Sequence, residues 1–142
     1  NKYVKEFLPT RDEIEQIRKH VIKKLEKMNN EISPNNTKLI CGVGGTVRAS
    51  RKLNNELFGL DESNKTLMVK DLKKIINYYL ENRHEFVAHL IKVVPDRLHT
   101  ILPGMIILDT VANYYGSDII EVSDYGVREG YLLHMFNKNV VW

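Results

Sequence analysis

Residues 39–46, with the sequence LICGVGGT, join an apolar run to a segment whose apolar residues recur with helical spacing. We expect a strand to turn directly into a helix here, at Gly42, Gly44 and Gly45. Glycine adopts positive φ and leaves no side chain between the backbone and a ligand. The helix would begin with unpaired N–H groups and the positive end of its dipole, which together attract phosphate. The turn from Gly42 to Thr46 is therefore either a phosphate or nucleotide contact or a tight turn that binds nothing, and spacing alone does not decide.

The composition indicates one domain of mixed charge. A length of 142 residues suits a single domain with its own core. The net charge of +3 comes from 21 basic and 18 acidic residues spread along the chain, which argues against a dedicated nucleic-acid-binding protein. No apolar run approaches the roughly 20 residues of a membrane span, so we expect no membrane partner. The single cysteine, Cys41, excludes a disulfide framework and fits a cytoplasmic setting, and we expect it to be buried in the strand.

Apolar periodicity and capping residues divide the chain into helices and two short strands. Thr10 and Glu13 form the Thr-x-x-Glu pattern of a capping box, so a helix should begin at Thr10. We expect Pro103-Gly104 to interrupt the helical pattern and Gly116 to end the apolar helix that resumes after it. About six helices are predicted, over residues 10–28, 47–57, 68–80, 85–91, 105–115 and 127–135, with a short helical turn at 95–97 and strands near 38–43 and 118–122.

Strands separated by helical segments indicate parallel pairing in an α/β arrangement. Two strands are too few to form a stable sheet alone, so we expect the chain to hold part of a larger sheet. Ligands of parallel α/β sheets lie beyond the carboxyl ends of the strands. Both predicted strands end in turns, at Gly42–Thr46 and Ser123–Gly126, and neighbouring strands would bring these turns to one crevice.

Several polar or small residues near these turns are candidates for the crevice lining, and each also has a simpler explanation. The candidates are Arg48, Arg97, Gly104, Asp124, Arg128 and Glu129. Arg48 lies in a basic helical segment that is either a solvated face or a contact for an anionic ligand. Asp124 would equally serve as the cap of the last helix, and Gly104 as a close contact between helices. Arg128 and Glu129 would equally form a solvated pair.

No catalytic group emerges from the residues themselves. The five histidines form no ligand set, since His84 and His89 are five apart rather than three or four. No serine lies in a nucleophile-elbow sequence, and local spacing suggests no acidic pair. We therefore expect neither a catalytic residue nor a metal ligand within this chain.

Three segments resemble the exopolyphosphatase / guanosine pentaphosphate phosphohydrolase (Ppx/GppA) family. They are residues 41–49 (CGVGGTVRA), residues 95–104 (PDRLHTILPG) and residues 122–130 (VSDYGVREG). Their order and approximate spacing also match the family, and the third segment is the most specific. The resemblance covers residues 7–136.

The resemblance implies that residues 1–142 are a single, partial domain, the C-terminal part of the family's second actin-like ATPase (ribonuclease H-like) domain. Family members hydrolyse terminal phosphoanhydride bonds of inorganic polyphosphate or guanosine pentaphosphate in a cleft between two domains, with a divalent metal such as Mg2+. The turn Gly42–Thr46 is similar to the nucleotide-contacting glycine motif of actin-like ATPases. Arg97 is similar to the arginine ahead of the family's Leu-Pro-Gly turn, so both would contact phosphate or nucleotide.

Other parts of the family pattern do not occur in these 142 residues. They are the phosphate loop of the form Asp-x-Gly-Gly-Gly-Ser, the first domain with its catalytic glutamate, and the hairpin strands that complete the sheet. We therefore expect this segment to form one wall of the cleft and to be inactive alone.

Three functions remain open from the sequence. The first is a phosphoanhydride hydrolase, of which this segment is a part. The second is a non-catalytic module that binds guanosine tetra- or pentaphosphate without releasing phosphate. The third is a dimerisation segment, in which an exposed helix face formed by Leu72, Ile76 and Tyr79 joins two copies into a homodimer.

Overall fold

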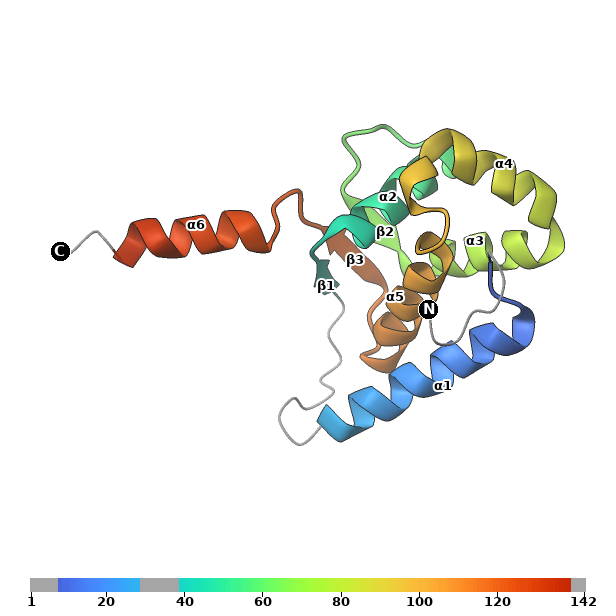
Figure 1. The fold of residues 1–142 in the computed structure, drawn as a ribbon, viewed down its shortest axis with the longest axis horizontal. Helices are drawn as coiled ribbons and strands as arrows, with labels where there is room; N and C mark the ends of the chain where they lie inside the picture. The colour runs from blue at the N-terminus through green and yellow to red at the C-terminus, as the bar shows by residue number, and fades with distance from the viewer. Residues whose placement is uncertain (1–7, 29–38, 139–142) are drawn as a thin grey trace.

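The computed structural model describes residues 8–28 and 39–138, which form a helix-rich α/β arrangement (Figure 1). Its elements in chain order are α1 (Arg11–Met28), β1 (Leu39–Gly42), α2 (Gly45–Phe58), β2 (Thr66–Met68), α3 (Val69–Glu81), α4 (Arg83–Val93), the 3-10 helix η1 (Pro95–Arg97), α5 (Ile101–Tyr114), β3 (Ile119–Val122) and α6 (Val127–Lys138). The predicted fold class, with six helices and short parallel strands, is confirmed.

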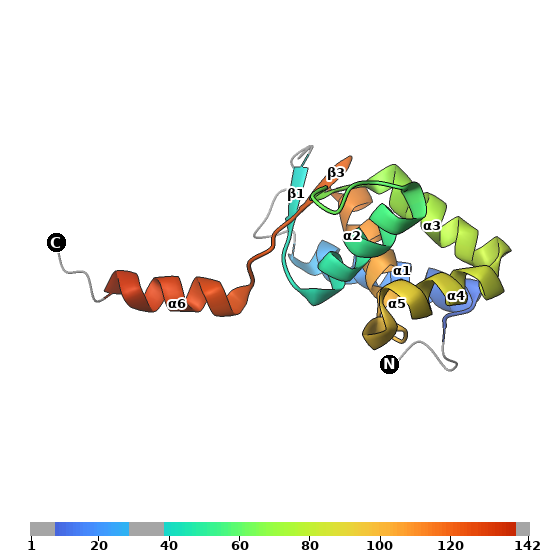
Figure 2. The ribbon, with the colours of Figure 1, turned by 90° about the horizontal axis from the view of Figure 1, so that it is seen from above.

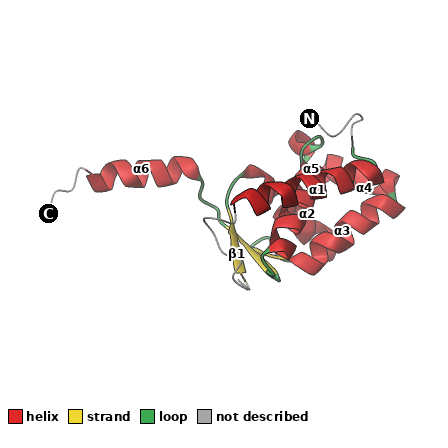
Figure 3. Ribbon diagram, turned by 90° about the horizontal axis from the view of Figure 1, so that it is seen from below, coloured by secondary structure: helices red, strands yellow, loops and turns green. Residues whose placement is uncertain are grey.

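A three-stranded sheet with the order β1-β3-β2 lies at one end of the body of helices (Figure 3). β1 and β3 pair in parallel, with Leu39 opposite Ile119 and Gly42 opposite Val122, as the sequence predicts. β2 pairs antiparallel with β3, and the sequence does not predict it. β2 has only three residues, which are too few to show an alternating pattern, and α3 follows it directly. Their strand character comes from the pairing with β3.

β1 lies at the edge of this sheet, and the expectation that Cys41 is buried in it is wrong. Leu39 and Cys41 are exposed, whereas Ile40 is half-buried and Gly42 is buried. An edge strand has a neighbour on one side only, here β3, and its alternate side chains point to opposite faces. Ile40 packs against the hydrophobic core. In the described part of the chain, nothing covers the face that carries Leu39 and Cys41.

The hydrophobic core forms around α5, which packs against α1, α2 and α3. Leu102 and Ile106 of α5 are fully buried. The helix face expected to join two copies also belongs to this core, because Leu72, Ile76 and Tyr79 are only 0%, 2% and 2% exposed. The apolar stripe of an amphipathic helix normally packs on its own domain. The expectation that this face is exposed, on which the dimerisation hypothesis depends, is therefore wrong.

α5 begins at Ile101 and continues through Pro103 and Gly104, so the expected interruption at this pair is wrong. Pro103 occupies the first turn, where backbone N–H groups have no intrahelical acceptor and a proline removes no hydrogen bond. The predicted end of the helix is confirmed. Gly116 follows it with a φ of 68°, a left-handed conformation that favours glycine.

α6 extends away from the other described elements (Figures 1 and 2). Its apolar side chains are exposed, including Val127 at 85% and Phe136 at 68%. The final helix that the periodicity predicts is confirmed, although no described element covers its apolar residues. None of the described helices is both long and apolar enough to cross a membrane.

The predicted capping box at the start of α1 is confirmed. The Thr10 N–H donates to Glu13 Oε2 at 2.8 Å, and the Glu13 N–H donates to Thr10 Oγ1 at 3.3 Å. We expect Thr10→Ala to lower the free energy of unfolding by about 1 kcal/mol, because α1 then loses one of these bonds. Thr100→Ala is the matched control, since Thr100 precedes α5 without a side-chain capping bond. Equal losses in urea denaturation of the two variants would contradict this role of Thr10.

Candidate phosphate-binding site

The turn between β1 and α2 leaves the N-terminus of α2 without a side-chain cap. Gly44 occupies the N-cap position with a φ of 118°, a conformation that other residues rarely adopt, and it makes no side-chain capping bond. The first turn of α2 also contains no acidic residue. The first N–H groups of a 14-residue helix are therefore available to an anion at this end.

Arg97 lies directly against this helix start. A Cβ on Gly45, the first residue of α2, would lie 2.5 Å from an Nη atom of Arg97, so the guanidinium occupies the space that glycine leaves free. Arg97 is exposed, and within the described residues its side chain forms no hydrogen bond or ion pair. The structure thus brings together two groups that attract phosphate, a helix N-terminus and a free guanidinium.

Gly104 allows the start of α5 to approach the start of α2. A Cβ on Gly104 would overlap Cγ2 of Thr46, so the first turn of α5 packs closely against the first turn of α2. Gly42 has a similar role, because a Cβ there would lie 2.6 Å from Cγ2 of Val47. For Gly104 the geometry therefore favours close helix packing, one of its two explanations, over a direct ligand contact.

A groove of about 1010 Å³ runs along α2 from Arg48 to its C-terminal end, and the end of α4 and η1 form its other wall. We call it the α2 groove. Arg97 lines it, whereas the residues from Gly42 to Thr46 do not. Five of its lining residues are basic, namely Arg48, Arg51, Lys52, Lys92 and Arg97, and three are acidic, namely Glu56, Glu62 and Asp96. The groove therefore carries an excess of positive charge among its lining side chains, which suits an anionic ligand.

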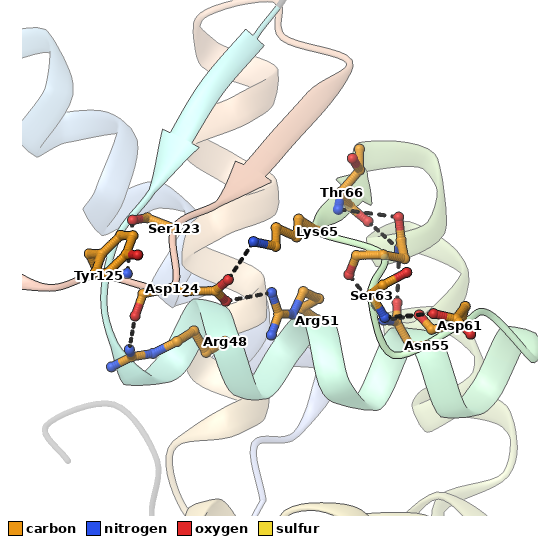
Figure 4. Close-up of polar contacts among 11 residues, drawn as sticks. Arg48, Arg51, Asn55, Asp61, Ser63, Lys65, Thr66, Ser123, Asp124 and Tyr125 are labelled. Carbon is orange, nitrogen blue, oxygen red and sulfur yellow. Dashed lines mark hydrogen bonds and ion pairs between the residues drawn. The ribbon is translucent and has the colours of Figure 1, made fainter.

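Asp124 joins the turn after β3 to α2 (Figure 4). Its Oδ1 accepts from Arg51 Nη1 at 2.9 Å and its Oδ2 from Lys65 Nζ at 2.7 Å, while Arg48 Nη1 donates to its backbone carbonyl at 2.8 Å. The Ser123 N–H donates to the Gly42 carbonyl at 2.9 Å. The two turns that follow the parallel strands are therefore adjacent, as the sequence predicts.

Asp124 is not the cap of α6, contrary to one explanation from the sequence. The Gly126 N–H donates to Glu129 Oε2 at 2.7 Å instead. Backbone hydrogen bonds from Glu129 itself and from Gly126 hold the pKa of the Glu129 carboxyl below its usual value. Arg128 and Glu129 are exposed in α6 and do not line the α2 groove, so their assignment to the cleft stays a prediction.

Lys65 and Lys92 are charged residues of this region that the sequence does not single out. Lys65 belongs to the loop before β2 and approaches Asp124 only because β2 pairs with β3. Lys92 Nζ donates to Glu56 Oε1 across the α2 groove at 2.6 Å. This hydrogen bond lowers the pKa of the Glu56 carboxyl. Both contacts depend on tertiary packing and have no local sequence signal.

The Asp124 contacts predict a pH dependence of stability. The hydrogen bonds from Lys65, and then from Arg51, hold the pKa of the Asp124 carboxyl below its usual value. A lowered folded pKa gives stability that is fully present above the unfolded pKa, about 3.9, and is lost as the pH falls through the folded pKa. We expect Asp124→Asn to lower the free energy of unfolding at pH 7, and its difference from the wild type to shrink below about pH 4.

Urea denaturation between pH 2 and pH 7 measures this difference. Asp118→Asn is the control, because Asp118 is also exposed next to β3 and forms no ion pair among the described residues. A difference between Asp124→Asn and the wild type that stays constant over this pH range would rule out the ionic role of Asp124.

The described residues contain no group of three or more His, Cys, Asp or Glu side chains that could hold a metal ion. The family resemblance implies Mg2+, which in phosphate sites is usually held by one or two carboxylates together with the phosphates of the substrate. We assign no residue to that metal.

Comparisons with family models and with solved structures find the same family. The model of the Ppx/GppA phosphatase family matches residues 1–139. The chain is similar to the crystal structure of the Aquifex aeolicus member of the Ppx/GppA protein family, with 25% identity and a TM-score of 0.74, over 98% of this chain and 45% of that chain. A second structure, of the Aquifex aeolicus PPX-GPPA enzyme, has 26% identity and a TM-score of 0.72, over 94% of this chain and 44% of that chain.

The crystal structure of the type II variant of the Aquifex aeolicus Ppx/GppA phosphatase gives the same values as the second structure. The chain thus spans less than half the length of these structures. Among curated proteins no significant match was found.

Proposed function

Because this chain belongs to the Ppx/GppA phosphatase family, we propose that the full-length protein hydrolyses terminal phosphoanhydride bonds of inorganic polyphosphate, guanosine pentaphosphate or both. The segment of the protein that this chain comprises forms one wall of the active site and holds the phosphates of the substrate. Gly42, Gly44, Gly45 and Thr46 bring the N–H groups of the α2 N-terminus to the phosphate oxygens. Arg97 adds a positive charge.

One observation carries this proposal: the free guanidinium of Arg97 lies against Gly45 at an uncapped helix N-terminus. Backbone N–H groups at a helix start and a guanidinium both donate to anionic oxygens. The α2 groove continues from this point with further cations, so it has room for phosphates beyond the one that reacts.

In the proposed reaction, a water oxygen attacks the terminal phosphorus and the bond to the bridging oxygen breaks. The bridging oxygen leaves with the shortened chain or nucleotide, and inorganic phosphate is released. Positioning and charge stabilisation supply most of the rate enhancement in such reactions. The family resemblance assigns the carboxylate that activates the water to the first domain. It also implies Mg2+, which would neutralise phosphate charge when bound.

The test is phosphate release by the full-length protein with Mg2+, measured on inorganic polyphosphate and on guanosine pentaphosphate in parallel. We expect release from at least one substrate, and loss of release on chelation of the metal. Nucleotide binding without any phosphate release would contradict the hydrolase and favour the non-catalytic binding module. Release from one substrate alone would identify the substrate.

A further inference from the structure

The α2 groove is much larger than one phosphate needs. Its volume of about 1010 Å³ lies at the upper end of the range for small-molecule sites. Along α2 its lining extends from Arg48 to Glu56 and on to Gly59. At about 1.5 Å per residue, Glu56 lies about 12 Å beyond Arg48 along the helix axis. The groove therefore suits an elongated ligand rather than a single phosphate.

Two of the basic side chains that α2 contributes to the groove already have partners. Arg51 pairs with the Asp124 carboxylate, and Arg48 donates to the Asp124 backbone carbonyl (Figure 4). Lys52, by contrast, is exposed and forms no hydrogen bond or ion pair among the described residues. Its ammonium therefore remains available to a ligand in the groove, as does the guanidinium of Arg97.

Lys52 and Arg97 belong to opposite walls of the α2 groove. Lys52 is part of α2, and Arg97 is part of η1. Arg97 lies against Gly45 at the start of α2, and Lys52 lies about 10 Å further along the helix axis. A ligand that contacts both cations must therefore carry negative charge at two well-separated points. A chain of phosphates meets this requirement, whereas a single phosphate does not.

The lining of the α2 groove favours an inorganic chain over a nucleotide. None of the described residues that line it is aromatic. Proteins that bind nucleotides in single strands commonly stack aromatic side chains on the bases. No such ring is available to a base here, whereas an inorganic chain presents charged oxygens to the free cations along its whole length.

An ion pair crosses the α2 groove one helical turn beyond Lys52. Lys92 Nζ, at the end of α4, donates to Glu56 Oε1 of α2 at 2.6 Å. This hydrogen bond is the main reason that the pKa of the Glu56 carboxyl is lowered, and the charge of Lys52 contributes less. Lys92 is thus neutralised. A phosphate chain that passes Lys52 meets the Glu56 carboxylate next, and this carboxylate repels it.

We propose that the α2 groove binds the inner phosphates of a linear inorganic polyphosphate, with the Lys52 ammonium as their contact and the Glu56–Lys92 pair as the end of the site. This inference rests on the proposed function, because Arg97 must hold the terminal phosphate for the chain to extend to Lys52. Lys52 is then a substrate-binding residue that selects long chains over short ones.

Isothermal titration calorimetry on the full-length protein tests this contact, with the metal chelated so that no phosphate is released. The probes are long-chain polyphosphate and pyrophosphate, which is too short to extend from Arg97 to Lys52. We expect Lys52→Ala to weaken long-chain binding about fivefold, as loss of one exposed charge contact does, and pyrophosphate binding by less than about twofold. Lys52→Arg should restore long-chain binding, because the charge returns.

Lys73→Ala is the matched control, since Lys73 is also an exposed helical lysine but does not line the α2 groove. Unchanged long-chain binding by Lys52→Ala, or equal weakening by Lys73→Ala, would overturn the proposal. Binding of polyuridylate as tight as that of long-chain polyphosphate would overturn it too, because the groove would then not select an inorganic chain.

Glu56→Gln provides a second test, with the opposite sign. It removes the repelling charge and frees Lys92, so long-chain binding should become about fivefold tighter. Weaker or unchanged binding by this variant would contradict the proposed end of the site. Absence of phosphate release with Mg2+ would contradict the hydrolase alone, since none of these binding constants depends on turnover.

Discussion

We expect Arg97→Ala in the full-length protein to lower kcat/KM for phosphate release about 100-fold, which corresponds to about 2.7 kcal/mol of lost transition-state stabilisation. The guanidinium supplies charge-assisted hydrogen bonds to phosphate oxygens, and alanine supplies none. Folding should be unaffected, because the side chain of Arg97 is exposed and has no partner in the described part of the chain. Steady-state phosphate release and thermal unfolding measure the two effects.

Arg11→Ala is the matched control for this variant. It removes another exposed guanidinium at a helix start, in α1, outside the α2 groove. Arg97→Lys should recover part of the rate, because the charge returns without the planar pair of donors. A kcat/KM of Arg97→Ala within twofold of the wild type would sink the assignment of Arg97 to the site.

Gly45→Ala is the second substitution with a large expected effect, of about tenfold in kcat/KM. Its Cβ would lie 2.5 Å from the end of the Arg97 side chain, so the guanidinium must move away from the helix start. The end of a long side chain moves more easily than a helix, and alanine suits a helix better than glycine. Stability should therefore not fall. Kinetics and thermal unfolding of the full-length variant measure both effects.

A double-mutant cycle shows whether Gly45 acts through Arg97. Because Gly45→Ala works only by displacing the guanidinium, it should add little once Arg97 is alanine. The Gly45→Ala/Arg97→Ala protein should then be as active as Arg97→Ala alone. Gly130→Ala is the control, since a Cβ there meets nothing within 4 Å. Losses that multiply in the double variant would contradict the coupling.

The sequence predicts correctly those features that depend on neighbouring residues. The capping box of Thr10 and Glu13 involves side chain and backbone within one turn. Gly116 ends α5 because its own backbone conformation requires glycine. The parallel pairing of β1 and β3 follows from the helices between them. The family resemblance, made on three short segments, is confirmed by the match over residues 1–139.

The features that the sequence misses depend on distant partners. β2 is a strand because β3 lies beside it, and Cys41 is exposed because no described element covers its face of β1. For the same reason, no local pattern predicts that Asp124 pairs with Arg51 and Lys65. The burial of the α3 face that carries Leu72 also escapes prediction, because periodicity identifies an apolar stripe but not what covers it.

The candidate site also combines features that the sequence predicts with features that depend on the fold. The glycines of the turn and Arg97 are identified from their segments in the sequence. Their proximity is a property of the fold, because η1 must bring Arg97 to the start of α2. Gly104 illustrates the difference most clearly: the sequence leaves two explanations open, and the overlap of a Cβ with Thr46 favours packing.

The equilibrium dissociation constants of guanosine tetraphosphate and pyrophosphate, for the full-length wild type and Arg97→Ala, test most directly whether the start of α2 binds phosphate. Neither probe needs to react, so the measurement isolates binding from catalysis. We predict that at least one probe binds the wild type and binds Arg97→Ala at least tenfold more weakly, a difference of about 1.4 kcal/mol. Equal dissociation constants for the two proteins, or no binding of either probe, would contradict the account.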